Sequence, residues 1–156
     1  MPPKVLYAGN PKDWPVYQTA LPRAFARVGI TVDLVDQTSA PETVDYIIYA
    51  PSSAVQDFRP YRRLKAVLNL WAGVEGVRRN KTLTVPLARM VETGMTAGMA
   101  EWVLGHVMRH HLGMDAHILG QDGIWRNEIT PPLARDRVVG LLGLGELGQA
   151  SAALLN

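Results

Sequence analysis

The chain has 156 residues, of which 47% are hydrophobic and 19% charged, a composition typical of a folded globular protein. It contains no cysteine, which excludes disulfides and thiolate catalysis. The net charge of +2 does not by itself indicate a polyanionic partner. No apolar run approaches the roughly 20 residues of a membrane helix, and the apolar stretch at the N-terminus is too short for a signal peptide. We therefore expect a cytoplasmic protein without membrane contact.

Basic residues are concentrated in the segment 59–81, which contains only one acidic residue, Glu75. Its cations are Arg59, Arg62, Arg63, Lys65, Arg78, Arg79 and Lys81. Such a cluster is one signal of nucleic-acid binding, but interleaved aromatic residues and a nucleic-acid motif are missing. We expect a solvated face without a nucleic-acid partner, which could still raise the local concentration of a small anion.

Strand and helix patterns alternate through residues 1–94. Five strands are expected at residues 5–8, 30–35, 45–50, 66–70 and 83–86. A helix is expected over 15–28, closed by Gly29, and a short basic helix around 61–64. This order predicts an α/β domain: a parallel sheet covered on both faces, in a flavodoxin-like three-layer arrangement over residues 1–94.

A long helix is expected over residues 96–119. Its apolar residues surround the helix rather than forming one stripe: Met99, Trp102, Val103, Leu104, Val107, Met108, Leu112, Met114 and Leu119. A helix that is apolar on nearly all sides must be buried on nearly all sides. We expect it to link two domains or to lie in a subunit interface.

All 4 histidines lie on this predicted helix. His106, His110 and His117 would fall within about 40° of one another around its axis, a placement that suits zinc. No carboxylate joins that stripe, and Met99 and Met114 flank it. The alternative is a row of hydrogen-bonded interface histidines, so no metal site is predicted.

A glycine-rich turn stands at Gly143-Leu144-Gly145-Glu146-Leu147-Gly148. It follows an apolar run at 138–142, expected to be a strand, and leads into a predicted helix over 149–155. This order is that of a dinucleotide site, in which the helix N-terminus faces pyrophosphate. The ribose-binding acid would lie about 20 residues further on, beyond Asn156. We therefore assign residues 95–156 to a helix and the incomplete start of a Rossmann domain.

A second small-residue turn, Trp71-Ala72-Gly73-Val74, follows the fourth expected strand. In open parallel sheets, ligands bind outside the carboxyl ends of the strands. Consecutive backbone N–H groups in such a turn form a concavity for an anion. A purely structural loop is the alternative.

Three segments, in this order, resemble the D-isomer-specific 2-hydroxyacid dehydrogenase family: LKAVLNLWAGVE at 64–75, GMAEWVL at 98–104 and VGLLGLGELG at 139–148. The pattern Val85-Pro86-Leu87 followed by Thr93-Gly94-Met95 is most similar to the glyoxylate/hydroxypyruvate reductase branch. The resemblance covers essentially the whole chain. It implies the N-terminal half of an oxidoreductase that transfers a hydride between NAD or NADP and a small 2-oxo or 2-hydroxy acid.

The resemblance also implies site residues. The substrate carboxylate would be held at Trp71, Ala72, Gly73 and Val74. The cofactor pyrophosphate would lie at Gly143, Leu144, Gly145, Glu146, Leu147 and Gly148. A homodimer would form through the helix 96–119. Glu75 departs from the aspartate common at its position in the family.

The catalytic residues implied by the resemblance, an arginine and a histidine oriented by a glutamate, follow the glycine turn in the family and have no counterpart here. We therefore assign no catalytic residue and expect no turnover from this polypeptide alone. The alternative from another class is a truncated, inactive module that binds a partner or a small anion. A flavodoxin-like phosphate binder is a third hypothesis, although no phosphate loop follows the first strand.

Overall fold

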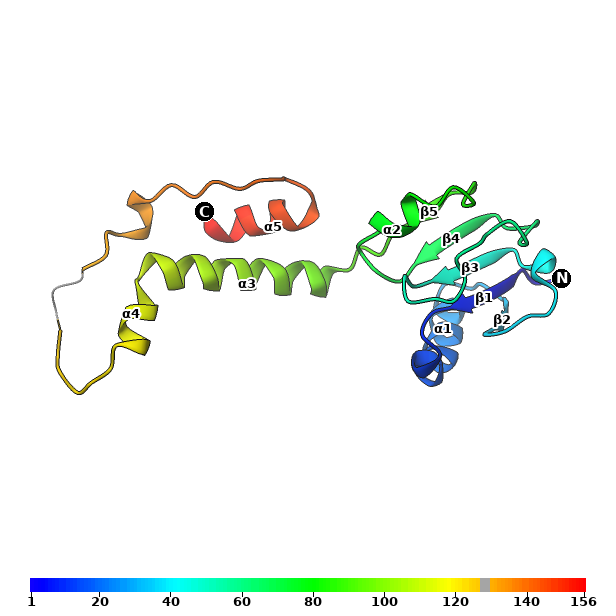
Figure 1. The fold of residues 1–156 in the computed structure, drawn as a ribbon, viewed down its shortest axis with the longest axis horizontal. Helices are drawn as coiled ribbons and strands as arrows, with labels where there is room; N and C mark the ends of the chain where they lie inside the picture. Colours follow the sequence, from blue (N-terminus) through cyan, green and yellow to red (C-terminus); the bar gives the residue numbers. More distant parts are fainter. Residues whose placement is uncertain (127–129) are drawn as a thin grey trace. The chain divides into compact units, whose positions relative to one another are not determined.

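A computed structural model describes residues 1–126 and 130–156 of the chain. The chain divides into two compact units, Met1–Val91 and Glu92–Asn156. Each unit is described by itself below (Figure 1). Within the connection that follows residue 123, positions 127–129 lie outside the described residues.

The first unit is built on a five-stranded parallel sheet with the strand order β2-β1-β3-β4-β5. This is the order of flavodoxin-like domains, so the predicted α/β class and sheet arrangement are confirmed. The strands are β1 (Lys4–Ala8), β2 (Asp33–Val35), β3 (Tyr46–Tyr49), β4 (Ala66–Asn69) and β5 (Leu87–Ala88). The two short 3-10 turns of this unit are η1 (Pro11–Asp13) and η2 (Pro41–Thr43).

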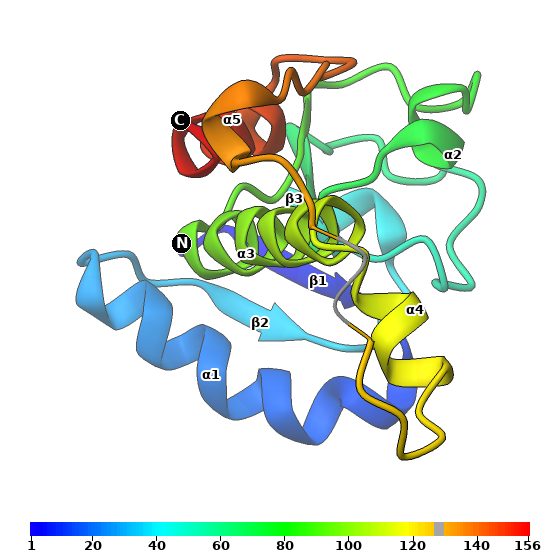
Figure 2. The same ribbon diagram turned by 90° about the vertical axis from the view of Figure 1, so that its left-hand side faces the viewer.

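The core of the first unit lies on both faces of this sheet. Side chains alternate along β1, so Val5 and Tyr7 belong to one buried cluster and Leu6 and Ala8 to the other. Helix α1 (Trp14–Arg27) packs its aromatic and apolar residues against the first cluster (Figures 1 and 2). The helix ends as predicted before Gly29, whose φ of 69° is a left-handed conformation that favours glycine.

The opposite face is covered differently from the prediction. The helix expected around 61–64 is wrong: these residues form turns, with the N–H of Leu64 donating to the carbonyl of Tyr61. Tyr61 and Leu64 instead pack as partly buried side chains on the core. Irregular chain and the short helix α2 (Glu75–Arg78), which buries Val77, complete this layer.

The fifth strand also lies later than expected, at Leu87–Ala88 instead of 83–86. Pro86 has no N–H to donate to a ladder, although its carbonyl accepts from Val67 at 2.9 Å. Pairing therefore begins with Leu87, which is in register with Val67.

The described residues of the second unit form three α-helices: α3 (Thr93–His111), α4 (Met114–Leu119) and α5 (Glu146–Leu155). The single helix expected over 96–119 is therefore wrong. Gly113 has a φ of 63°, a left-handed conformation that interrupts the helical hydrogen bonds and lets the chain restart as α4. None of the described helices has the length and apolar character needed to cross a membrane.

The strand expected at 138–142 is also absent from the described residues. This segment follows the 3-10 turn η3 (Ala134–Asp136) and leads to α5, which lies alongside α3 (Figure 1). A β-strand requires a neighbouring strand for its backbone hydrogen bonds, and the described part of this unit contains no strand. Residues 138–142 therefore have the apolar sequence of a strand but do not pair with another strand in the described part of the chain.

Helix α3 is much less enclosed than its apolar sequence predicted. Of its residues only Ala100 is buried, and Trp102 is 59% exposed. Enclosure of this helix by a second domain or by a subunit interface stays a prediction. Exposed apolar surface of this kind marks interaction sites.

Candidate functional site

The loop that follows β4 lies at the carboxyl edge of the parallel sheet. Tyr49 and Asn69 are paired residues at the ends of β3 and β4, and the N–H of Leu70 donates to the carbonyl of Tyr49 at 2.7 Å. This hydrogen bond is at the end of the β3–β4 pairing and fixes the point at which the chain leaves the sheet. The residues that follow, 71–74, therefore occupy the edge at which parallel sheets bind ligands.

Asn69 holds this loop from inside the unit. The residue is 5% exposed, and its Nδ2 donates to the carbonyl oxygens of Trp71 at 2.7 Å and Gly73 at 2.9 Å. The N–H of Met90, just after β5, donates to the same Trp71 carbonyl at 3.3 Å. Two carbonyl groups of the loop are thus drawn inward.

The N–H groups of the loop are left available. Among residues 1–126 and 130–156, no backbone or side-chain group accepts a hydrogen bond from the N–H of Ala72, Gly73 or Val74. Successive unpaired N–H groups form a partly positive concavity suited to an anionic oxygen. A Cβ at Gly73 would lie 2.9 Å from Oε2 of Glu75, so this carboxylate lies directly beside the loop.

In the glycine turn of the second unit, the backbone conformation and the space around the Cα atom differ among Gly143, Gly145 and Gly148. Gly143 has a φ of 95°, which L side chains rarely adopt. A Cβ at Gly148 would lie 2.1 Å from the carbonyl oxygen of Gly143, so helix and turn approach too closely for a side chain. At Gly145 a Cβ would meet no atom within 4 Å. These are the tight turn, the close packing and the open backbone of a dinucleotide-binding turn.

Helix α5 begins directly after this turn. Gly145 is its N-cap residue, and no side chain caps the helix. Gln149 braces the turn, since its Nε2 donates to the carbonyl of Leu144 at 2.8 Å and its N–H donates to that of Gly145 at 2.9 Å. The first amides, those of Glu146 and Leu147, stand at the positive end of the helix dipole, where phosphate oxygens bind.

The predicted site residues thus form two turns in two units. Trp71 to Val74 belong to the first unit, and Gly143 to Gly148 to the second. Each turn has the local geometry expected for an anion. That both belong to one ligand cleft stays a prediction.

Part of the basic segment is neutralised by ion pairs. Asp45 is 2% exposed and contacts Arg63 at 3.0 Å and Lys65 at 3.2 Å. The hydrogen bond from the N–H of Lys4, followed by those from Lys65 and Arg63, lowers the pKa of Asp45. Arg59 pairs with Asp57 and lowers its pKa to about 2. These pairs support the predicted solvated face.

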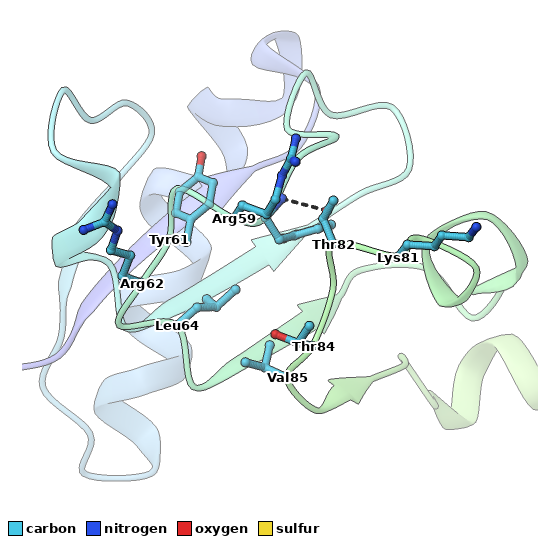
Figure 3. A pocket seen from close by; sticks show the side chains of 9 residues that line it. Arg59, Tyr61, Arg62, Leu64, Lys81, Thr82, Thr84 and Val85 are labelled. Carbon is cyan, nitrogen blue, oxygen red and sulfur yellow. Dashed lines mark hydrogen bonds between the residues drawn. The ribbon is translucent and has the colours of Figure 1, made fainter.

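Two of the other cations, Arg62 and Lys81, line a cavity of about 570 Å³ in the first unit (Figure 3). Leu64 and Val85 in its wall precede β4 and β5, so this end of the cavity lies where those strands begin, while the loop 71–74 follows the end of β4. Figure 3 shows the side chains of Arg62 and Lys81 pointing away from each other. The cavity therefore does not focus its charge on one small anion, and it does not join the loop.

The histidines of α3 and α4 do not form a metal centre. In the described residues, no group of three or more His, Cys, Asp or Glu side chains is placed to hold a metal ion. The His106 ring instead contacts the Trp102 ring, with centroids 4.1 Å apart. Nδ1 of His111 is buried without a hydrogen-bond partner in the described part of the chain. The row of interface histidines stays a prediction.

The fold is similar to those of solved 2-hydroxyacid dehydrogenases. A probable 2-hydroxyacid dehydrogenase from Rhizobium etli, in complex with NADP, HEPES and tartaric acid, matches 99% of this chain and 49% of its own, with a TM-score of 0.79 and 25% identity. The NADPH-dependent glyoxylate/hydroxypyruvate reductase from Sinorhizobium meliloti, in complex with NADP and sulfate, matches 98% and 49%, with a TM-score of 0.74 and 30% identity. The chain is thus similar to members of this family, and it spans about half the length of these two solved proteins.

Similar curated proteins include glyoxylate/hydroxypyruvate reductases. Glyoxylate/hydroxypyruvate reductase A from Serratia proteamaculans is 36% identical over 101 residues, which cover 60% of this chain and 32% of the reductase. The reductase of the same name from Yersinia enterocolitica is 35% identical over 96 residues, covering 57% of this chain and 31% of that protein. No protein-family model matches the chain.

One residue of the site was not predicted as functional. Asn69 was part of the motif in 64–75, but its side chain was given no role. The signal was available: an amide side chain occupies the last position of a buried apolar strand, directly before a small-residue turn. Buried polar side chains need hydrogen-bond partners, and the nearest ones are the carbonyl groups of that turn.

Proposed function

We propose that this chain supplies two anion-binding elements of an NAD(P)-dependent 2-hydroxyacid dehydrogenase of the glyoxylate/hydroxypyruvate reductase type. The loop at Trp71, Ala72, Gly73 and Val74 binds the carboxylate of a small 2-oxo or 2-hydroxy acid. The observation that carries the proposal is the run of N–H groups at 72–74 without an acceptor among the described residues, at the ligand-binding edge of the sheet.

The cofactor proposal rests on the three glycines of the second turn. The positive φ of Gly143, the close approach at Gly148 and the open space at Gly145 fit a pyrophosphate on the N-terminus of α5. Bound NADPH would supply the hydride that reduces the 2-oxo acid. The structural relatives from Rhizobium etli and Sinorhizobium meliloti bind NADP, which supports this cofactor class.

The residues of this chain act by binding and orienting. The loop amides fix the carboxylate, and thereby the direction in which the neighbouring 2-oxo carbon points. The amides of Glu146 and Leu147 fix the pyrophosphate at the helix N-terminus. Reduction also requires a proton donor for the new alkoxide and a cation at the substrate, and we assign neither role to a residue of this chain.

We also propose that a second copy of the chain covers the exposed side of α3. Several large apolar side chains of α3 and α4 are exposed: Met99, Trp102, Met114, Ile118 and Leu119. Contiguous apolar surface of this kind marks interaction sites. A symmetric dimer would bring the same helix of each copy together.

The alternative function is a catalytically inactive module that binds a small anion or a partner. It shares the loop amides with the first proposal but requires no cofactor. The two therefore differ in one property, the affinity of the glycine turn for a dinucleotide.

Calorimetric titration of the 156-residue chain with NADPH and NADH tests the difference. Micromolar to millimolar binding of either, lost when Gly145 is replaced by aspartate, supports the dehydrogenase proposal. Gly145→Asp places a carboxylate where the pyrophosphate would lie, while Gly140→Asp makes the same change outside the turn and serves as control. Binding of oxamate without any binding of NADPH or NADH would favour the inactive anion-binding module.

A further inference from the structure

We propose that Asn69 is a positioning residue that sets the direction of the loop amides at Ala72 and Val74. Its side-chain amide binds the carbonyl oxygens of Trp71 at 2.7 Å and Gly73 at 2.9 Å. The identity of the anion rests on the function proposed above. The shaping of the loop by Asn69 stands on these contacts alone.

The covalent geometry of the peptide unit connects Asn69 to the amides. In a trans peptide, the C=O of one residue and the N–H of the next lie in one plane and point in opposite directions. The described residues contain no cis peptide. The carbonyl of Trp71 shares its peptide with the N–H of Ala72, and the carbonyl of Gly73 with that of Val74. Because Asn69 draws both carbonyl groups inward, both N–H groups must point away from it.

The orientation of the Asn69 side chain follows from its partners. Carbonyl oxygens only accept hydrogen bonds, so the Nδ2 end of the side chain must face both of them. The opposite end, Oδ1, is buried and has no partner among the described residues. An unsatisfied buried acceptor is unfavourable. The two hydrogen bonds donated by Nδ2 are therefore the contacts that assign this side chain to the loop.

The position of Asn69 in the sheet holds its side chain rigidly against the loop. The residue is the last of β4, is paired in register with Tyr49 and is 5% exposed. A donor fixed by the sheet can hold a loop that lacks regular backbone hydrogen bonds. Groups that are ordered before the ligand arrives bind it with a smaller entropic penalty.

The test uses the full isotope-labelled chain with oxamate, a 2-oxo acid analogue, as probe. Asn69→Ala removes the side-chain amide, and Asn69→Asp keeps its shape but removes both donors. The matched control is Asn80→Asp, because Nδ2 of Asn80 also donates to a loop carbonyl, that of Gln56 at 2.7 Å. We expect both Asn69 variants to bind oxamate about tenfold more weakly, as expected from the loss of one or two oriented hydrogen bonds. Asn80→Asp should bind as the original chain does.

A spectroscopic readout separates positioning from general stability. The carbonyl carbon shifts of Trp71 and Gly73 should change in both Asn69 variants without ligand, while NADPH affinity at the glycine turn stays unchanged. Unchanged carbonyl shifts with unchanged oxamate affinity would overturn the proposal. If the original chain binds no oxamate but the shifts change in the variants, the proposed function fails and the positioning of the loop stands.

If the Asn69 variants do not fold, the proposal can still be tested on the original chain. Scalar couplings across the hydrogen bonds from Nδ2 of Asn69 to the two carbonyl carbons are then measured. Detection of both couplings supports the proposal. Their absence, in spectra where backbone couplings between β3 and β4 are seen, overturns it.

Discussion

The two units differ in how completely they bury their apolar residues. The sheet of the first unit is packed on both faces, and Val44, Ile47 and Val67 have no exposed surface. In the described part of the second unit, the buried residues are Ala100 and Ser151. The first unit therefore has the core of an independent domain. The second presents exposed apolar surface of the kind that marks interaction sites.

The two candidate turns differ in how their shape is held. The loop 71–74 is shaped by a side chain, that of Asn69, which binds two of its carbonyl groups. The turn 143–148 depends mainly on the absence of side chains at Gly143 and Gly148, although the Gln149 side chain also donates to its Leu144 carbonyl. In the function proposed above, both arrangements direct backbone N–H groups at a ligand. The two turns should consequently respond to opposite kinds of substitution.

The largest effect is expected for Gly148→Ala. The new Cβ would lie 2.1 Å from a backbone oxygen, that of Gly143, which no side-chain movement can relieve. Alanine gains about 1 kcal/mol of helix propensity over glycine, but an overpacked contact costs about 1–3 kcal/mol and more against backbone. We expect α5 to detach from the turn and NADPH affinity to fall at least tenfold. Amide hydrogen exchange measures the detachment of α5, and calorimetry measures the NADPH affinity. Unchanged exchange rates and an unchanged affinity would contradict a close approach at Gly148.

The next effect concerns the sheet of the first unit and its pH dependence. The pKa of Asp45 is lowered by the N–H of Lys4, then by Lys65 and Arg63. Its contribution to stability is therefore present above its ordinary pKa of 3.8 and is lost as the pH falls through the lowered value. Asp45→Ala should destabilise the unit by about 1–3 kcal/mol at pH 7, and by progressively less as the pH falls below 4.

Hydrogen exchange of the β3 amides at pH 7 and thermal melts from pH 7 to pH 2 measure this difference. Asp57→Ala is the control, because its partner Arg59 is a largely exposed side chain and the pair contributes little. An equal difference between Asp45→Ala and the original chain at every pH would contradict the role of the charged carboxylate.

A smaller effect is expected on self-association. Trp102→Ser removes the largest exposed side chain of α3, and central aromatic residues of interfaces contribute about 2 kcal/mol or more. The dimer dissociation constant should rise at least tenfold in sedimentation equilibrium. Trp125→Ser, which changes a residue 89% exposed in the connection after α4, should have no effect. A stable monomer of the original chain at micromolar concentration would contradict the proposed dimer.

The smallest effect on stability is expected for Gly145→Ala. The new Cβ meets no atom within 4 Å, and the φ of −75° is accessible to alanine. Loss of glycine at the N-cap costs less than about 1 kcal/mol. Thermal melts should change little while NADPH affinity falls, because the side chain occupies the space left for pyrophosphate. An unchanged affinity would place the cofactor elsewhere.

Sequence patterns predicted the first unit well because the buried strands of a parallel sheet have continuous apolar sequences. Apolar runs identified β1, β3 and β4, and Gly29 gave the end of α1. Errors occurred where distant residues decide: Pro86 delays β5 until pairing with Val67 can start. Similarly, residues 138–142 have the apolar sequence of a strand, but a strand forms only with a neighbour.

The sequence indicated the two candidate turns, but it did not indicate which side chain shapes the loop 71–74. The glycines and the turn 71–74 are visible as motifs because few residue types fit them. The role of Asn69 depends on which way a buried amide points, and a sequence does not specify that direction. The break at Gly113 was missed for a related reason, since glycine allows a left-handed φ without requiring it.

The most direct measurement is an amide chemical-shift titration of the isotope-labelled chain with oxamate and, separately, with NADPH. We expect oxamate to shift the amides of Ala72, Gly73 and Val74, and NADPH to shift those from Gly145 to Gly148. Oxamate shifts centred on the cavity at Arg62 and Lys81, or NADPH shifts outside the glycine turn, would contradict the proposed binding sites.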